Sequence, residues 1–275
     1  MKKTRRLEIS AGRITWEVHL QGDQPQWLFA FHGFNRGFDD WSALATKVSS
    51  KYSLAAVSLF HHGSIFTGAN DVDAFTPEEL RTAFNQLVGT ITREQYGVIG
   101  HSFGGRLALN MVEYGPPGLK ELYLMAPDAL RYHPGYRFIT GTSFGRYLIG
   151  NFRNDPKRII GLIRFFAKLG VYKPRTADYF IHQITHEKSR ELVYKCWMSH
   201  RKTIPHLGKI VQLLKASKIK TTLIFGAKDT VIPVSQGSRF AKRTYGVSSL
   251  HVLDAGHRIY EKTDAISGII MSENQ

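Results

Sequence analysis

Three residues whose side chains can together perform nucleophilic catalysis stand far apart in this chain of 275 residues: Ser102, Asp229 and His257. A serine hydroxyl is a weak nucleophile at neutral pH. It needs a histidine that accepts its proton and a carboxylate that orients the histidine. The chemistry open to such a set is acyl transfer through a covalent acyl-enzyme.

The residues around Ser102 predict an abrupt turn from a strand into a helix. A segment rich in valine, isoleucine and tyrosine leads up to Gly100, and apolar residues recur at helical spacing afterwards, at Leu107, Ala108, Met111 and Val112. Gly100 and Gly104 allow the two segments to approach closely. The turn would expose the serine oxygen beside a helix N-terminus, whose N–H groups stabilise negative charge.

His257 is the predicted base among the 12 histidines. It follows the last predicted strand, in SSLHVLDAGH, on a loop at the carboxyl edge of the sheet, where catalytic groups of such sheets gather. His101 adjoins Ser102, but neighbouring side chains at a tight turn diverge. We expect His101 to fill space or to make a local hydrogen bond.

The orienting acid is predicted to be Asp229, just past a strand that ends at Phe225. The resulting chain order of serine, aspartate and histidine is that of one known hydrolase arrangement. Asp128 is the alternative, because it also follows a strand. Asp254 is too close to His257 in sequence to reach around it, so we expect it to be structural.

Two backbone N–H groups are candidates for stabilising an oxyanion. Phe103 supplies one as the residue after the serine, and Phe34 supplies the other because His32 and Gly33 end a neighbouring strand. Each such donor is typically worth about 3 kcal/mol of transition-state stabilisation.

Strands and helices alternate over most of the chain, which predicts a parallel sheet. The pattern indicates a hairpin (7–9 and 14–18), strands at 27–33, 53–60 and 119–127, a helix over 39–50 capped by Asp39 or Asp40, a helix that starts at Thr76 and Pro77, and a helix over 235–244. Residues 131–206 show helical stretches without a strand. We therefore predict an α/β core of residues 1–130 and 207–275 with a helical cap insertion, 131–206.

Charge is concentrated in the predicted insertion, which carries +11 of the net charge of +15. No nucleic-acid-binding motif accompanies the charge, so a nucleic-acid partner is not expected. No apolar run is long enough to cross a bilayer, and peripheral contact with a membrane stays open. The single Cys196 and a basic start without an apolar signal segment point to the cytoplasm. The oligomeric state is left open.

The proposed chemistry needs neither a cofactor nor a metal. His61 and His62 are adjacent, but two neighbouring histidines make a poor metal site without further ligands at fitting geometry.

The chain resembles the α/β-hydrolase superfamily through four motifs in the expected order: HG at 32–33, GHSFGG at 100–105, GxxD at 226–229 and GH at 256–257. The resemblance spans nearly the whole chain outside the insertion. It implies a mostly parallel, twisted sheet with flanking helices, and it assigns the nucleophile to Ser102. A serine there disfavours the dehalogenase and epoxide-hydrolase branches, which use aspartate. Many members carry an acid and GHG after the third sheet strand, whereas SLFHHGS here keeps His62, Gly63 and Ser64 without that acid.

The expected function is that of a serine hydrolase acting on a carboxylic ester or thioester, with a small acyl substrate that has an anionic or lipid-like portion. Hydrolysis of a carbon–carbon bond uses the same triad and stays an alternative. HGFNRGFDDW and GHSFGGR also resemble a synthase of menaquinone biosynthesis that eliminates pyruvate; this resemblance implies that Arg106 binds a substrate carboxylate. The alternative is that Arg106 has no role in binding and is a charge on the surface of a helix. A non-catalytic binding module is disfavoured because all three triad residues are present.

Overall fold

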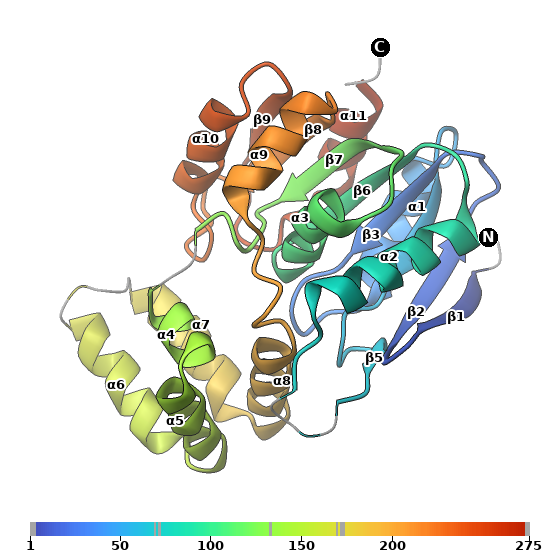
Figure 1. Cartoon of the computed structure of the whole chain (residues 1–275). Coiled ribbons are helices and arrows are strands. Elements are labelled where there is room, and N and C mark those ends of the chain that lie inside the picture. Colours follow the sequence, from blue (N-terminus) through green and yellow to red (C-terminus); the bar gives the residue numbers. More distant parts are fainter. Residues whose placement is uncertain are drawn as a thin grey trace. The chain divides into compact units, whose positions relative to one another are not determined.

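The computed structural model describes residues 4–68, 70, 73–131, 134–168, 170 and 174–272. These residues divide into two compact units (Figure 1), the first formed by 1–67, 76–130 and 203–275 and the second by 68–75 and 131–202. We call them the sheet unit and the helical unit and describe each by itself.

The sheet unit contains a sheet with the strand order β1-β2-β4-β3-β6-β7-β8-β9, and β5 pairs with β2. The strands are β1 Arg5–Ala11, β2 Ile14–Gln21, β3 Trp27–Phe31, β4 Ser53–Val57, β5 Ile65–Phe66, β6 Tyr96–His101, β7 Leu119–Met125, β8 Lys220–Gly226 and β9 Ser248–Leu253. β2 pairs in antiparallel fashion with β1, β4 and β5. The pairs β4–β3, β3–β6, β6–β7, β7–β8 and β8–β9 are parallel. The predicted mostly parallel sheet is therefore present.

Helices cover both faces of this sheet. They are α1 Ser42–Lys47, α2 Pro77–Ile91, α3 Phe103–Tyr114, α9 Leu207–Ala216, α10 Val234–Arg243 and α11 Thr263–Ser272. Figure 1 shows α2, α3 and α9 on one face and α1 and α11 on the other, and α3 contacts both α2 and α9. Because both faces are covered, the central parallel strands are buried almost throughout, which explains why their sequences are apolar without alternation.

An aromatic cluster in the core joins the hairpin to α2. The ring of Trp16 lies 4.6 Å from that of Phe60 and stacks on Phe84 at 5.6 Å, and all three side chains are fully buried. The Trp16 indole N–H donates to the carbonyl of Ala83 over 2.9 Å, so the one polar atom of the ring is satisfied.

Helix α2 begins as predicted. The Thr76 hydroxyl accepts the backbone N–H of Glu79, the Glu79 carboxylate accepts the backbone N–H of Thr76, and Pro77 takes the first helical position. This reciprocal pair satisfies two N–H groups that would otherwise lack partners.

The predicted helix over 39–50 is wrong in its cap and its length. The structure has a 3₁₀ turn, η1 Phe38–Trp41, followed by the short α1, and Trp41 is the residue before α1. Asp39 and Asp40 lie inside η1, so neither precedes α1 as its cap. The Asp40 carboxylate pairs with the Arg36 guanidinium.

The helical unit consists of α4 Pro134–Gly141, α5 Ser143–Asn154, α6 Lys157–Lys168, α7 Pro174–Thr185 and α8 Glu187–Ser199, together with residues 68–75. Residues 132, 133, 169 and 171–173 of the predicted insertion lie outside the described residues. No helix in the described ranges has both the length and the apolar character needed to span a bilayer.

The boundaries of the helical unit differ from the predicted 131–206. Residues 203–206 belong to the sheet unit, because Asn110 donates to the carbonyl of Thr203 and the backbone N–H of His206 donates to Glu113, both from α3. The segment 68–75 joins the helical unit instead: the Phe75 N–H donates to the carbonyl of Ser199 over 3.3 Å.

Candidate active site

Ser102 occupies a strained turn between β6 and α3. Its backbone adopts φ 51° and ψ −116°, a combination that residues other than glycine rarely take and that costs about 1–3 kcal/mol. Two backbone hydrogen bonds keep Ser102 in this conformation: its N–H donates to the carbonyl of Met125 over 3.0 Å, and its carbonyl accepts the N–H of Asp128 over 2.7 Å.

The glycines around the serine allow backbone to approach backbone. A Cβ on Gly104 would lie 2.1 Å from the carbonyl oxygen of Phe31 and 2.3 Å from that of His32. A Cβ on Gly100 would lie 2.5 Å from the carbonyl oxygen of Gly104. The first turn of α3 therefore packs directly on the ends of β3 and β6, and no residue with a side chain fits there without a shift.

The three residues selected from the sequence meet at the carboxyl edge of the sheet. His257 Nε2 lies 2.9 Å from Ser102 Oγ, and His257 Nδ1 lies 2.7 Å from Asp229 Oδ2. Because a carboxylate only accepts hydrogen bonds, Nδ1 carries the proton and Nε2 is left to accept the serine hydroxyl proton. The side chain of His257 is 16% exposed, so a small part of its ring is accessible to solvent.

Asp229 is held in place by its own loop. Its second oxygen, Oδ1, accepts the backbone N–H groups of Val231 at 2.8 Å and Ile232 at 2.9 Å, and its side chain is fully buried. Three hydrogen bonds thus balance the cost of burying the carboxylate, and they fix the oxygen that faces His257.

The other candidate acids lie elsewhere. The Asp128 carboxylate pairs with the Arg106 guanidinium, with Nη2 and Oδ2 2.5 Å apart, and the Arg106 side chain is only 2% exposed. Arg106 is therefore not on the helix surface, and its binding of a substrate carboxylate stays a prediction. Asp254 is exposed and pairs with Lys228 at 2.6 Å, a structural contact as expected.

The loop that follows β3 lies next to the nucleophile. A Cβ on Gly33 would be 3.6 Å from the Cβ of Ser102. The ring of Phe34 meets that of Phe103 edge to face, with centroids 6.4 Å apart. The two residues predicted to supply oxyanion N–H groups are thus neighbours, one after β3 and one at the start of α3.

Two buried histidines near the site are uncharged. Burial lowers the pKa of His32 to about 3, and it does the same for His101, where the nearby His257 adds to the effect. His101 fills space as expected, because its side chain is buried, but its hydrogen bond is not local: Nε2 donates to the carbonyl of His257 over 2.9 Å, across 156 residues of chain. It thereby fixes the backbone of the loop that carries the candidate base.

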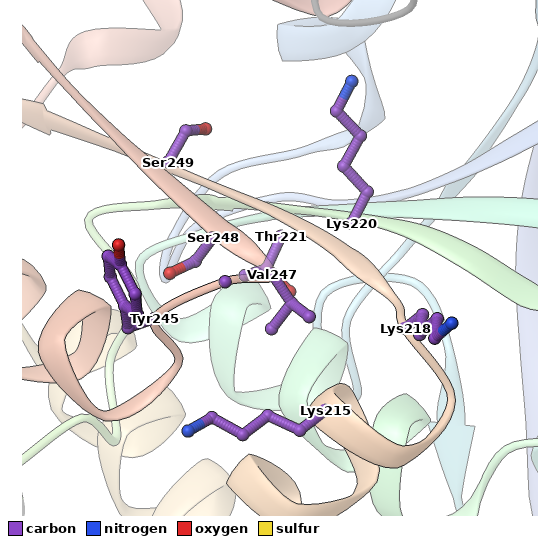
Figure 2. Close-up of a pocket in the computed structure, with 9 residues that line it drawn as sticks. Lys215, Lys218, Lys220, Thr221, Tyr245, Val247, Ser248 and Ser249 are labelled. Atoms are coloured by element: carbon purple, nitrogen blue, oxygen red, sulfur yellow. The ribbon is translucent and has the colours of Figure 1, made fainter.

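A pocket of about 710 Å³ lies at the opposite edge of the sheet (Figure 2). Lys220 and Ser248, which open β8 and β9, line it together with Lys215, Lys218, Thr221, Tyr245, Gly246, Val247 and Ser249. Its three lysine side chains extend in different directions (Figure 2). Asp229 and His257 follow the carboxyl ends of the same strands, so this pocket is separate from the candidate active site.

Besides the pairing of Arg106 with Asp128, sequence reasoning missed a contact of His62. His62 Nε2 accepts the backbone N–H of Asn35, directly after Phe34, over 2.9 Å. The only signal was the retention of histidine, glycine and serine at 62–64, because the pairing of residues so far apart is visible only in the fold.

Comparisons with known proteins identify the family of this fold. The sequence model of the family described as alpha/beta hydrolase fold matches residues 26–263, which confirms the predicted fold class. A fluoroacetate dehalogenase from a Burkholderia species is 24% identical over 161 residues, or 57% of this chain and 52% of that protein. The chain thus spans about half the length of this curated relative.

Solved structures resemble the chain over nearly its full length. A thermophilic esterase from Thermogutta terrifontis is 18% identical with a TM-score of 0.68, covering 98% of this chain and 97% of that one. The thioesterase domain from the curacin biosynthetic pathway is 14% identical with a TM-score of 0.67, covering 98% and 99%. At these identities the likeness concerns the fold.

Proposed function

Since the chain belongs to the α/β-hydrolase fold family, we propose that it is a serine hydrolase that cleaves a carboxylic ester or thioester through an acyl-enzyme. One observation carries the proposal: Ser102 Oγ, His257 and Asp229 form a continuous hydrogen-bonded series, with heavy-atom distances of 2.9 and 2.7 Å. Both distances lie within the range at which a nucleophile and its base exchange a proton.

In the first half-reaction Ser102 Oγ attacks the acyl carbon while His257 Nε2 takes the hydroxyl proton. The carbonyl oxygen becomes an oxyanion and accepts hydrogen bonds from the N–H groups of Phe34 and Phe103. Collapse of the tetrahedral intermediate breaks the bond to the alcohol or thiol, which leaves with the proton from Nε2. Asp229 stabilises the imidazolium throughout and keeps its own charge.

The second half-reaction repeats these steps with water as the nucleophile. His257 takes a proton from water, and the hydroxide attacks the acyl-enzyme. The second tetrahedral intermediate then collapses to the free acid. Ser102 regains its proton from His257, so the enzyme returns to its starting state.

The charge of residues 131–206 supports a substrate with an anionic portion. This segment carries 15 lysines and arginines against 4 acidic residues, and it also exposes the aromatic side chains of Phe138, Phe144, Tyr147 and Phe165. Positive potential draws anions towards it, and apolar surface suits an acyl chain. We propose a small acyl substrate that combines the two properties.

The other reactions of this fold gain less support. A mechanism that alkylates a carboxylate, as the sequence resemblance implies for the dehalogenase branch, requires aspartate where this chain has Ser102. The elimination alternative relied on Arg106, whose guanidinium is buried beside Asp128.

The proposal is tested with Ser102→Ala and a fluorophosphonate probe. The wild-type protein is expected to hydrolyse short p-nitrophenyl esters and to gain the mass of one phosphonyl group, and Ser102→Ala should lose both properties. Ser42→Ala removes an exposed hydroxyl at the start of α1 and serves as the control, which should match wild type. Labelling or turnover that persists in Ser102→Ala would refute the proposed nucleophile.

A further inference from the structure

His62 joins two loops at the candidate active site through both of its ring nitrogens. Its Nδ1–H donates to the carbonyl of Phe60 over 3.0 Å, and Nε2 accepts the backbone N–H of Asn35 over 2.9 Å. The carbonyl partner fixes the tautomer, so Nε2 has a lone pair directed at the loop after β3. Burial lowers the pKa of His62, which keeps the ring uncharged at neutral pH.

The backbone N–H that His62 accepts belongs to an exposed turn residue of the loop after β3. Asn35 has φ 55°, in the left-handed region, and it is exposed to solvent. A bond from water would satisfy the Asn35 N–H without holding it in one direction. The hydrogen bond to His62 fixes the peptide plane between Phe34 and Asn35. Only the two backbone dihedral angles of Phe34 then separate its own N–H from this fixed plane.

The side chain of Phe34 is held from two sides. Its ring meets the ring of His62 edge to face at 5.6 Å and the ring of Phe103 at 6.4 Å. Aromatic pairs in this arrangement attract each other beyond what their buried area contributes. The same histidine therefore contacts both the backbone that follows Phe34 and the Phe34 side chain.

The loop that carries His62 is itself held by hydrogen bonds. The Ser64 hydroxyl is buried, donates to the carbonyl of Ser58 over 2.6 Å and accepts the backbone N–H of Glu17 over 2.8 Å. A second histidine repeats the bridge in the opposite direction: His32 Nε2 accepts the N–H of Leu59 over 3.1 Å. The two rings touch, with centroids 5.3 Å apart, so the two loops hold each other.

We infer that His62 is a positioning residue for acyl transfer, which keeps the Phe34 N–H aimed at the developing oxyanion by holding the peptide that follows it. The inference rests on the proposed serine hydrolase function. His62 does not touch the reacting atoms; it acts through the loop that does.

Two substitutions separate the hydrogen bond from the ring contact. His62→Phe keeps an aromatic ring against Phe34 but has no acceptor for the Asn35 N–H. His62→Gln loses the ring but offers an amide oxygen near the position of Nε2. We expect His62→Phe to lower kcat about 10- to 100-fold with little change in KM, because displaced groups lose transition-state contacts first. His62→Gln should restore most of this loss.

A boronic acid that forms a tetrahedral adduct with serine provides the readout that altered packing alone would not move. Its affinity should fall in parallel with kcat/KM across wild type, His62→Gln and His62→Phe, because the adduct places an oxygen where the oxyanion forms. His61→Asn is the matched control: His61 is the adjacent histidine with φ 65°, a conformation that asparagine tolerates, and the variant should behave as wild type.

The results that would overturn the inference are distinct. Full activity of His62→Phe, or equal losses in the Phe and Gln variants with unchanged boronate affinity, would reduce His62 to a packing residue. Should His62→Phe fail to fold, His62→Asn, whose shorter amide cannot reach the Asn35 N–H, takes its place with the same expectation. Turnover that survives Ser102→Ala would instead refute the proposed function itself.

Discussion

His257 Nδ1 donates to Asp229 Oδ2 over 2.7 Å, across 28 residues of chain. Asp128, the other acid that the sequence left open, pairs with Arg106 instead. The contact therefore favours Asp229 as the orienting acid. We predict that Asp229→Asn lowers kcat by about 10⁴-fold, because the amide favours the wrong imidazole tautomer.

The matched variant for this prediction is Asp128→Asn. It should keep catalysis but lower the free energy of unfolding by about 1–3 kcal/mol, because the buried Arg106 guanidinium loses a charged partner. Steady-state kinetics and urea denaturation on both variants measure the two effects. The reverse pattern, with catalysis lost only in Asp128→Asn, would transfer the orienting role to Asp128.

Gly104→Ala should damage the site, because its methyl carbon would lie 2.1 Å from the Phe31 carbonyl oxygen. Backbone must shift to admit it, and the shift moves Ser102. We expect the free energy of unfolding to fall by about 1–3 kcal/mol and kcat to fall with it.

Gly89→Ala is the control for that substitution. Gly89 lies in α2, and nothing lies within 4 Å of its added Cβ. There the change should raise the free energy of unfolding by about 0.5–1 kcal/mol through helix propensity. Thermal denaturation of the two variants tests the opposite signs, and a tolerated Gly104→Ala would show that the first turn of α3 packs less closely on β3.

Acid should destabilise the protein through its buried histidines. Burial lowers the pKa values of His32 and His101 to about 3, whereas both groups titrate near 6.5 in the unfolded chain. Between these pH values the unfolded chain binds more protons, so the free energy of unfolding falls as pH falls. Each histidine contributes about 1.4 kcal/mol per pH unit.

His101→Gln isolates one of these contributions. Its amide N–H can still donate to the His257 carbonyl, but it does not titrate. Urea denaturation from pH 7 to pH 4 gives the free energy of unfolding as a function of pH. The slope of this dependence should correspond to about one bound proton fewer in the variant than in wild type. An unchanged slope would mean that His101 is protonated in the native protein as readily as in the unfolded chain.

Salt should distinguish substrates by charge. The Debye length shortens from about 30 Å at 0.01 M to about 10 Å at 0.1 M, which weakens attraction to the cationic residues 131–206. We expect kcat/KM for anionic esters or thioesters to fall over this range and that for neutral analogues to stay nearly constant. Equal salt dependence for both groups would place the positive charge away from the substrate path.

Local sequence signals predicted the elements that local interactions form. The strand-to-helix turn at Ser102 and the cap at Thr76 both depend on residues within a few positions, and both are present. The start of α1 was missed because Asp39 and Asp40, expected as its cap, lie inside the preceding 3₁₀ turn. The contacts between Arg106 and Asp128 and between His62 and Asn35 join separate segments, so only the folded sheet reveals them.

The position of β9 makes catalytic competence sensitive to local unfolding. β9 ends the strand order, pairs only with β8 among the described strands, and is only partly buried along its length. Outer strands open more readily than central ones, and His257 enters the site directly after this one. Fraying at that margin would withdraw the imidazole while Ser102, anchored between β6 and α3, stays in place. We therefore expect enzymatic activity to be lost through opening of β9 before the core unfolds.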